Sequence, residues 1–562
     1  MRRVLVVTAG LLPACATHRP PADLLLINAN VHTLDAGRPR AEAIAIRGDR
    51  IVFVGSSTDA RALQGSATVV RDLAGATVVP GLADAHYHLG GVGEREMTLN
   101  LEGTDTKAAF LARVQERVAQ TPAGEWVIGS GWIETFWVPQ AFPTRQDLDR
   151  IAPDHPVVLT RADGHASVLN SKALAVAQVT RTTPDPKGGS ILRDASGEAT
   201  GMLIDWAQGL IAVHMPKDSP AKRDSMLVVG ARRSTELGWT QVQNAGGSWD
   251  EVGRLRRLYA SGTMKLRVYQ AIGGPGKESD SLLAVGPSVG EFGGRLTIRT
   301  IKTFVDGALG SRGALLLAPY SDEPAAKGLM TGDTAKLRPM LAAALAKGVQ
   351  VEAHAIGDSA NRLILNLYDA AFRTVAPAQR AGASRDLRWR IEHAQIIDPA
   401  DIPRFKSLGV IPSMQPSHAI GDLYFADKRL GVPRLSGAYA WKSFIDQGVP
   451  VAGGSDAPVE RGEPMIEFYA AVARRDIRGK AGDDAVWHPE QRVSRTEALR
   501  MFTTYAAHAA FEERVRGSIT VGKWADLTVL DRDIMSIPDA EILLTRAVMT
   551  LIAGEIVFER KR

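Results

Sequence analysis

Two histidines separated by a single residue, His86 and His88, follow a short apolar stretch of the chain. In an extended segment this spacing places both imidazoles on one face, where they can converge on one metal ion. His354, His393 and Asp456 have a similar setting, because each stands at or just after the end of a short apolar run. These residue types at these positions predict a metal centre.

Each of these residues also has a purely structural interpretation. An isolated His-x-His pair is weak evidence, His393 can hydrogen-bond to neighbouring Glu392, and Asp456 can simply begin a turn after Gly454 and Ser455. However, four of only 12 histidines fall at the ends of apolar runs that look like strands. This coincidence favours one shared site over several unrelated positions.

A lysine within an apolar segment, Lys302, is the unusual member of the set. Burial disfavours the charged ammonium, so this lysine is expected either to pair with an acid or to lose its proton. A neutral amine can take up carbon dioxide and become a carbamate, which is an anionic ligand able to bridge two metal ions. The alternative is a charged Lys302 that pairs with a nearby carboxylate such as Asp306.

These residues form one site only if the strands that carry them meet. Strand-like and helix-like segments alternate through the middle of the chain, as is typical of parallel βαβ units, and one helix is expected at Thr334–Lys347 with Gly348 as its end. We therefore predict an α/β fold with a distorted (β/α)8 barrel, in which reactive groups lie at the carboxyl ends of the strands. The eight predicted strands are 78–85, 239–243, 266–270, 296–304, 349–353, 387–391, 410–414 and 449–453.

The two ends of the chain contain short β-like segments separated by Asn, Asp and Gly turns. We expect residues 22–79 and 515–562 to form one discontinuous domain and residues 80–514 to form the barrel. The stretch from about 89 to 235 is too long for a single crossover and has strand-like pieces of its own, so it is interpreted as an insertion.

The first residues of the chain predict export. Arg2 and Arg3 precede an apolar run, Val4 to Leu12, that is too short to span a bilayer but suits a signal-peptide core. Residues 1–20 are therefore expected to be a signal peptide for the bacterial periplasm or cell envelope. The single cysteine, Cys15, has a setting similar to a lipoprotein signal, which would give a lipid anchor, although Pro13 departs from that pattern. The alternative is an ordinary cleaved signal.

The composition excludes some functions. Of 562 residues, 45% are hydrophobic and 23% charged, which is ordinary for a globular protein. The excess of 67 basic over 62 acidic residues leaves a net charge of only +5, and no dense Lys/Arg block stands out. Nucleic acid is therefore not expected as a partner. The chain also lacks a GxSxG motif, so serine hydrolase chemistry has no candidate nucleophile.

Several motifs point to one family. In chain order they include Asp84-Ala85-His86-Tyr87-His88, His354-Ala355-Ile356-Gly357-Asp358, Glu392-His393-Ala394-Gln395, Ser413-Met414-Gln415-Pro416 and Gly453-Gly454-Ser455-Asp456-Ala457-Pro458. Together they resemble the amidohydrolase superfamily, particularly its branch similar to N-substituted formamide deformylases. The likeness runs from about Leu24 to Phe558, and it implies that the terminal segments form a composite β-sandwich.

The resemblance also implies a division of the metal ligands. One or two divalent ions are expected, and zinc is the first choice because imidazole and carboxylate ligands suit it, ahead of manganese, cobalt and iron. The implied sets are His86, His88 and Asp456 for the more buried ion, His354 and His393 for the second, and carboxylated Lys302 as the bridge.

A hydrolytic mechanism follows from such a centre. A bound metal ion lowers the pKa of water to about 7 and so produces hydroxide at neutral pH. Asp456 is the expected general base, which takes the proton of that water and returns it to the leaving nitrogen. Candidates for substrate contacts are Trp132, His165, Arg312 and His418. For each of them the alternative is packing or a surface hydrogen bond.

The expected reaction is hydrolysis of a C–N bond, other than a peptide bond in a protein, in a small amide, formamide, carbamate or cyclic amide. Deamination of a ring is a second option with the same metal chemistry, and it would release ammonia instead of a carboxylate and an amine. A third option is a non-catalytic exported binding protein that retains the barrel. The intact set of ligand residues argues against this third option.

Overall fold

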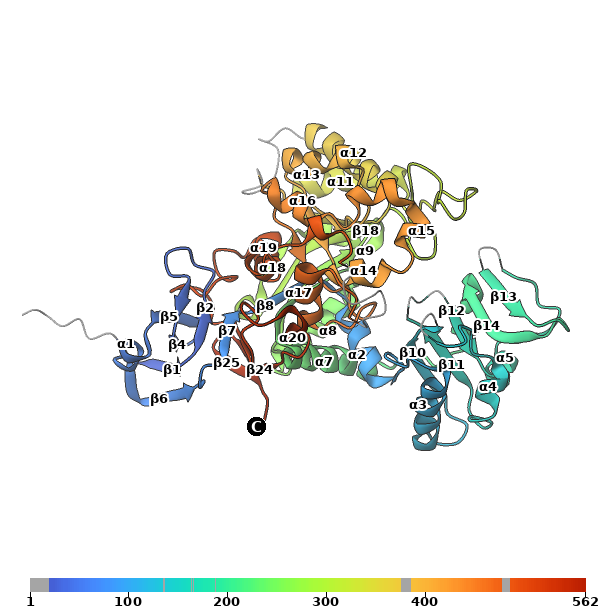
Figure 1. The fold of residues 1–562 in the computed structure, drawn as a ribbon, viewed down its shortest axis with the longest axis horizontal. Helices are drawn as coiled ribbons and strands as arrows, with labels where there is room; N and C mark the ends of the chain where they lie inside the picture. The colour runs from blue at the N-terminus through green and yellow to red at the C-terminus, as the bar shows by residue number, and fades with distance from the viewer. Residues whose placement is uncertain are drawn as a thin grey trace, which may run out of the picture.

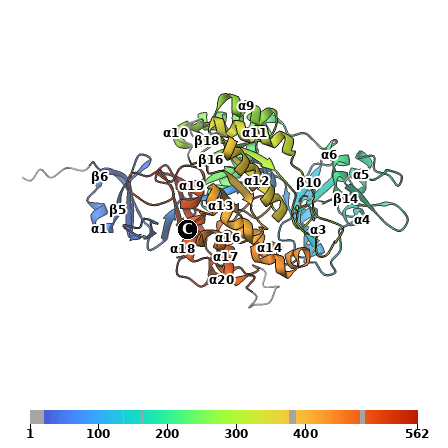
Figure 2. The same ribbon diagram turned by 90° about the horizontal axis from the view of Figure 1, so that it is seen from above.

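A computed structural model describes residues 20–134, 137–162, 164, 166–186, 189–374, 386–477 and 486–561. These residues form three units in a row: sheets from both chain ends, a central barrel, and a lobe built on a third sheet (Figures 1 and 2). Cys15, with nearly all of the predicted signal peptide, and His165 lie outside the described residues. Among the described helices, none combines the length and apolar character that a membrane crossing requires.

Eight parallel strands form a nearly closed barrel, as predicted. Main-chain hydrogen bonds connect the ends of its first and last strands. The amide of Asp456 donates to the carbonyl of His86 (2.7 Å), and the amide of His88 donates to the carbonyl of Ala457 (2.8 Å). The barrel strands are β8 (Leu82–Tyr87), β15 (Trp239–Asn244), β16 (Arg267–Gly273), β18 (Leu296–Phe304), β19 (Gln350–Ala355), β20 (Arg390–His393), β21 (Ile411–Met414) and β22 (Ala452–Gly453).

Helices surround this sheet, as the view from above shows (Figure 2). Helix α11 has the predicted bounds, Thr334–Lys347, and it ends at Gly348, whose φ of 67° lies in the left-handed region that favours glycine. Other helices around the barrel, labelled in Figure 1 or Figure 2, are α7 (Pro220–Leu237), α8 (Trp249–Ala260), α9 (Lys277–Val285), α12 (Asp358–Thr374), α13 (Ile402–Leu408), α16 (Trp441–Asp446), α17 (Pro464–Ala473), α18 (Arg495–Met501) and α19 (Thr504–Ala509).

The first predicted barrel strand, 78–85, is in fact two strands. β7 (Thr77–Pro80) belongs to a terminal sheet, and the barrel strand β8 begins only after Gly81. A Cβ atom on Gly81 would lie 2.5 Å from Oγ1 of Thr240 and 2.9 Å from the main chain of Asp526. The break between the two sheets therefore falls where only a glycine fits, although the apolar residues on both sides read as one strand.

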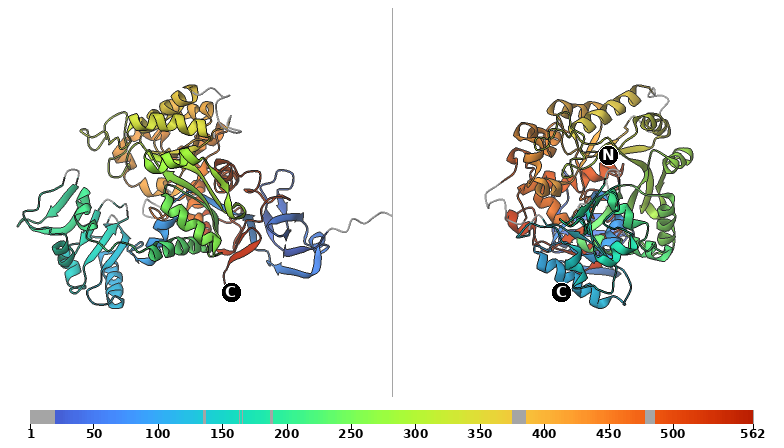
Figure 3. Two further views of the ribbon diagram at one scale, coloured as in Figure 1. Left: turned by 180° about the vertical axis from the view of Figure 1, so that it is seen from behind. Right: turned by 90° about the vertical axis from the view of Figure 1, so that its right-hand side faces the viewer.

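Two sheets contain the ends of the chain (Figure 3). β7 pairs antiparallel with β23 (Leu527–Leu530), which joins the N-terminal and C-terminal segments in one sheet. Apolar side chains from both sheets share a core that includes Leu26, Ile44 and Leu551. The remaining strands are β1 (Ala22–Ile27), β2 (Asn30–His32), β3 (Arg40–Ala41), β4 (Ala43–Arg47), β5 (Arg50–Gly55), β6 (Gln64–Asp72), β24 (Ala547–Ile552) and β25 (Glu555–Glu559).

The lobe at the other end of the molecule is a six-stranded sheet between Leu99 and Asp205. Helix α2 (Leu89–Met97) leads from the barrel into this lobe, and it packs closely against α7, where the main chains approach at Gly93 and Gly230. The strands of the lobe are β9 (Leu99–Asn100), β10 (Val127–Trp132), β11 (Val157–Arg161), β12 (Ala166–Leu169), β13 (Gly189–Arg193) and β14 (Ala199–Asp205).

Candidate metal centre

The barrel brings the six predicted ligand residues to its carboxyl end. His86 lies in β8 and His88 follows it, whereas Asp456 comes shortly after β22. The remaining three belong to adjacent strands β18, β19 and β20. Two atom-to-atom distances and two ring distances connect the group. Nζ of Lys302 lies 3.3 Å from Nε2 of His86, and Nε2 of His88 lies 3.1 Å from Oδ1 of Asp456. The ring centroid of His393 lies 4.8 Å from that of His86 and 4.6 Å from that of His354.

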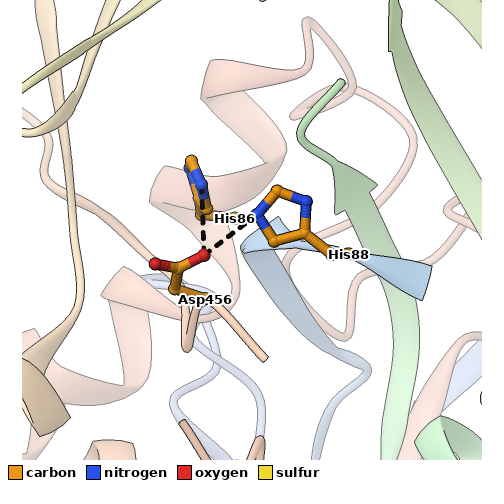
Figure 4. Close-up of side chains that lie close together, drawn as sticks. All are labelled: His86, His88 and Asp456. Carbon is orange, nitrogen blue, oxygen red and sulfur yellow. Dashed lines mark ion pairs between the residues drawn. The ribbon is translucent and has the colours of Figure 1, made fainter. Parts of the chain in front are cut away.

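His86, His88 and Asp456 form one compact trio, whose donor atoms all lie within 4.8 Å of one another (Figure 4). The same carboxylate oxygen, Oδ1 of Asp456, lies 3.5 Å from Nε2 of His86 and 3.1 Å from Nε2 of His88. The side chain of His86 is 1% exposed and that of Asp456 is 9% exposed, but that of His88 is 35% exposed. The trio can therefore bind one cation that is enclosed on one side and open on the side of His88.

A buried acid fixes the orientation of His86. Glu392 accepts a hydrogen bond from Nδ1 of His86, which leaves Nε2 to face Asp456. Arg390 donates two hydrogen bonds to Glu392, at 2.7 and 3.0 Å. Burial by itself would raise the pKa of Glu392, but Arg390 and His86 lower it to about 2, so the acid stays charged. A carboxylate behind a histidine is a common arrangement in metal sites.

His393 is oriented in a similar way. Its Nδ1 lies 2.8 Å from Oε1 of Gln415, which can only accept, so Nδ1 carries the proton and Nε2 is free to bind a metal. Glu392, the sequence neighbour of His393, pairs with His86 and not with His393. The alternative that these two neighbours form a hydrogen-bonded pair is therefore wrong, because Glu392 bonds to His86 and Nδ1 of His393 bonds to Gln415.

Lys302 is almost fully buried, with an exposed fraction of 2%. Burial lowers the pKa of its ammonium group, although Glu352, Glu392 and Asp456 oppose that effect. The alternative partner, Asp306, is occupied elsewhere: its carboxylate accepts hydrogen bonds from the amides of Ile356 (3.0 Å), Gly357 (2.8 Å) and Leu315 (2.8 Å). Asp306 therefore connects the end of β18 with the end of β19.

His354 also fits the role of a ligand. Among the described residues, its buried Nε2 has no hydrogen-bond partner, and the nearest carboxylate oxygen, on Asp306, is 3.6 Å away. Burial, with a smaller effect from Lys302, lowers the pKa of His354 to about 3. The ring is therefore neutral at pH 7 with a lone pair available, which is the form that binds a metal.

Asp84 aligns the two strands that carry the trio. Its carboxylate accepts hydrogen bonds from the amide (2.9 Å) and hydroxyl (2.6 Å) of Ser455 and from the amide of His86 (3.1 Å). Sequence reasoning did not single out Asp84, Arg390 or Gln415. Asp84 and Gln415 stand within the family-like motifs, and Arg390 lies two residues before Glu392 in β20. Their closeness in sequence to the ligand residues was the signal that could have identified them.

The four residues predicted to contact the substrate have different positions in the structure. Trp132 is fully buried in the core of the lobe and donates its indole N–H to the carbonyl of Leu159 (2.9 Å), so the structure gives it a packing role instead. Arg312 pairs with Asp322 at 3.1 Å. His165 lies outside the described residues. His418, on α14 (Pro416–Asp422), does reach the centre, with its Nε2 3.7 Å from Oδ2 of Asp456.

Comparisons with known proteins identify the family of the chain. Residues 69–558 match the model of the family described as the amidohydrolase family. The chain belongs to the amidohydrolase family. Similar curated proteins include Protein LONG AFTER FAR-RED 3 of Arabidopsis thaliana, which is 36% identical over 91% of this chain and 87% of that protein. The N-substituted formamide deformylase of Arthrobacter pascens is 30% identical, with 96% and 98% covered.

A solved structure with a similar fold is also known. It is an uncharacterized metal-dependent hydrolase from Pyrococcus furiosus, 26% identical, which aligns with a TM-score of 0.71 over 91% of this chain and 100% of its own. The family, the barrel and the candidate metal-binding residues together identify the protein as a metal-dependent hydrolase of the amidohydrolase superfamily.

Proposed function

We propose that this amidohydrolase cleaves a C–N bond other than a peptide bond in a protein, in a small amide, formamide, carbamate or cyclic amide. The observation that carries the proposal is the single carboxylate oxygen of Asp456 shared by the imidazoles of His86 and His88. This arrangement provides both a cation site and an acid–base group at the same point. The printed name of the Arthrobacter relative makes N-substituted formamides the first substrates to test.

The donor set fits a divalent metal ion. Burial lowers the pKa of His86 to about 4, with Lys302 adding to the effect, so the imidazole is neutral at pH 7. Neutral imidazoles and a carboxylate suit zinc. When bound, such an ion supplies Lewis acidity and makes water acidic near neutral pH. His86, His88 and Asp456 would hold one ion, and His354, His393 and a carboxylated Lys302 would contribute to a second.

Asp456 is the proposed general base. Burial alone would raise its pKa, but His86, His88 and His393 hold it well below its usual value, so the carboxylate is charged at neutral pH. A carboxylate of such low basicity would take a proton only from water that a bound ion makes acidic. Because it is then a strong acid, it readily passes that proton to the more basic leaving nitrogen.

Two measurements test the proposal. The first is the metal content of the purified protein beside Lys302→Ala, for which we expect about two equivalents per chain in the wild type and a sharp fall in the variant. The second is a panel of N-substituted formamides, other amides and carbamates, with the products identified. A carboxylate and an amine support the proposal, whereas ammonia and an oxo-ring would replace it with ring deamination. A wild type that neither contains nor takes up metal would refute it.

Export is part of the same proposal. The support is the sequence alone: two arginines, a short apolar run and Cys15 at its end. Fractionation of the native host would show the protein in the periplasm or envelope. A Cys15→Ser variant would leave the membrane fraction if the cysteine carries a lipid, and it would stay unchanged if the signal is an ordinary cleaved one.

A further inference from the structure

An aromatic ring that the proposed mechanism does not use lies next to the metal centre. Phe304 is the last residue of β18, two positions after Lys302, so both side chains lie on the same face of the strand. The centre of its ring lies 5.1 Å from Nζ of Lys302 and 5.4 Å from the centre of the His354 ring. Phe304 is nevertheless 50% exposed. Part of the ring is therefore free to contact a molecule that enters the carboxyl end of the barrel.

The loop that follows β18 carries two further exposed apolar side chains. Leu329 is 68% exposed and Met330 is 54% exposed. Their loop returns to the end of β18, because the amide of Gly332 donates to the carbonyl of Val305 (3.2 Å) and a Cβ atom on Gly332 would lie only 2.4 Å from the carbonyl oxygen of Phe304. Exposed apolar side chains that gather in one place often mark a ligand-binding surface. We call Phe304, Leu329 and Met330 the apolar rim.

The loop is held in place by its own hydrogen bonds. The amide of Leu329 donates to the carbonyl of Gly313 (3.0 Å), which joins the returning leg of the loop to the outgoing one. The outgoing leg is fixed by Asp306, whose carboxylate accepts a hydrogen bond from the amide of Leu315 (2.8 Å). This leg also lies directly on the turn after β19, where a Cβ atom on Gly357 would lie 2.1 Å from the carbonyl oxygen of Leu315. The apolar rim is therefore formed before a substrate binds, which lowers the entropic cost of binding.

We propose that the apolar rim binds a large apolar substituent on the nitrogen of the bond that is cleaved. The proposal rests on the hydrolase function above, and it narrows the substrate class to N-substituted formamides or amides with an aryl group or an alkyl chain of several carbons. In a formamide the carbonyl carbon carries only hydrogen, so any apolar group is on the nitrogen. The three side chains of the rim carry no charge, so they favour such a group over a charged one. Because the ring of Phe304 is so close to Lys302 and His354, it is expected to contact the atoms attached directly to that nitrogen.

N-Alkyl-N-hydroxyformamides test the apolar rim without turnover, because their two oxygens bind a metal ion while the alkyl chain takes the place of the substituent. The full-length protein, loaded with zinc, would be titrated with the methyl, butyl and hexyl analogues by calorimetry. Complete removal of one methylene from water raises the affinity about fourfold. A single wall of apolar side chains should give about half of that free energy, or about twofold in affinity per methylene. We therefore expect the hexyl analogue to bind about 30-fold more tightly than the methyl analogue.

Variants of Phe304 show whether its ring is responsible. In Phe304→Ala the ratio of hexyl to methyl affinity should fall below about fivefold, and Phe304→Leu should restore part of it, because leucine is again apolar. The matched control is Phe292→Ala. Phe292 is also partly exposed, at 40%, but it lies in α10 (Glu291–Gly294), at the opposite end of β18 from the metal centre, and this variant should keep the wild-type ratio. Circular dichroism and thermal unfolding would confirm that each variant folds.

Formamide substrates separate this inference from the proposed function. In the wild type, kcat/KM for N-hexylformamide should exceed that for N-methylformamide by about 30-fold, and the ratio should fall in Phe304→Ala. Equal affinity for the methyl and hexyl analogues would overturn the apolar rim, and an unchanged ratio in Phe304→Ala would overturn the role of Phe304. Hydrolysis of both formamides with equal kcat/KM would leave the hydrolase intact and overturn the rim. If affinity rises with chain length but no formamide or other amide is hydrolysed, the rim stands and the proposed function fails.

Discussion

At the scale of single residues, the centre depends on which nitrogen of each imidazole is left free. Glu392 accepts a hydrogen bond from Nδ1 of His86, and Gln415 accepts one from Nδ1 of His393. Both rings therefore present Nε2 to the centre. A charged partner such as Glu392 also increases the basicity of the imidazole, so the two histidines should differ in how strongly they bind a metal.

Replacing Glu392 by Gln tests that difference. The variant keeps an acceptor beside His86 but removes the charge, so we expect metal affinity to fall by ~10–100-fold, measured by competition with a chelator. Glu490→Gln is the matched control, because Glu490 also bonds to Nδ1 of a histidine, His488 (3.0 Å), but is 57% exposed. Thermal unfolding is followed in parallel because Arg390 loses a buried counter-charge. An unchanged affinity would contradict the role of Glu392.

Lys302 leads to a second prediction at this scale. Burial lowers the pKa of its ammonium group, which favours the neutral amine that reacts with carbon dioxide. Metal-free protein kept in carbonate-free buffer should take up metal more fully when bicarbonate is added, and 13C-labelled bicarbonate should give a carbamate signal by NMR. Lys302→Arg should show neither effect. A wild type that is indifferent to bicarbonate would argue for an unmodified lysine.

At the scale of elements, the helix that follows the ligand histidines is held by a close main-chain approach. A Cβ atom on Gly93 in α2 would lie 1.7 Å from the carbonyl oxygen of Met226 in α7. Gly90, in the same helix, has only a methyl group of Leu227 at 4.0 Å. The two glycines therefore differ in the space around them although they share one helix.

Alanine at these two positions should change the stability differently. Gly93→Ala forces α2 and α7 apart, so we expect a loss of about 2 kcal/mol or more in the free energy of unfolding, of the size that overpacking causes. Gly90→Ala should be neutral or slightly stabilising, because alanine is the better helix former. Urea unfolding of the two variants measures both effects. Equal stability of the two would show that the helices can separate without cost.

Sequence reasoning predicted some helices and strands correctly and missed others. The barrel and α11 could be predicted because apolar periodicity and glycine stops are local signals. The division of strand 78–85 at Gly81 could not, because it depends on contacts with Thr240 and Asp526 far along the chain. The pairing of Glu392 with His86 spans 306 residues, and it was equally hidden from local patterns. The ligand positions were predictable because the fold places them at strand ends.

At the scale of the whole molecule, one buried ion pair joins the terminal sheets to the barrel. Arg267, the first residue of β16, donates two hydrogen bonds to Asp526, at 2.7 and 2.9 Å. The two side chains are 0% and 2% exposed. Asp526 also accepts a hydrogen bond from the amide of Ala553 (2.8 Å), next to β24, so it connects three parts of the chain.

Removing the charge of Asp526 should lower the stability of the folded chain. Asp526→Asn leaves Arg267 buried without the carboxylate to which it is hydrogen-bonded, so we expect a loss of ~3–5 kcal/mol in the free energy of unfolding. Asp369→Asn is the control, since the pair of Asp369 and Arg373 lies on an exposed helix surface and should contribute little. Thermal and urea unfolding of both variants would measure the difference. A loss no larger than that of the control would contradict this role.

The same ion pair predicts a pH dependence. Burial by itself would raise the pKa of Asp526, but Arg267 lowers it below the usual value. A carboxyl group with a lowered folded-state pKa contributes stability that is fully present above its unfolded pKa of about 3.9 and is lost as the pH falls through the folded value. The stability gap between wild type and Asp526→Asn should therefore be constant near neutral pH and shrink below about pH 4. A gap that widens in acid would contradict this assignment.

The closure of the barrel has a consequence for when the protein can acquire metal. The hydrogen bonds from Ser455 to Asp84 join positions 371 residues apart, and the carboxylate of Asp456 meets His86 and His88 at the same junction. While the ribosome is still making the second half of the barrel, the two early histidines have no carboxylate opposite them. Metal capture should therefore be a late event in biogenesis that marks a completed chain.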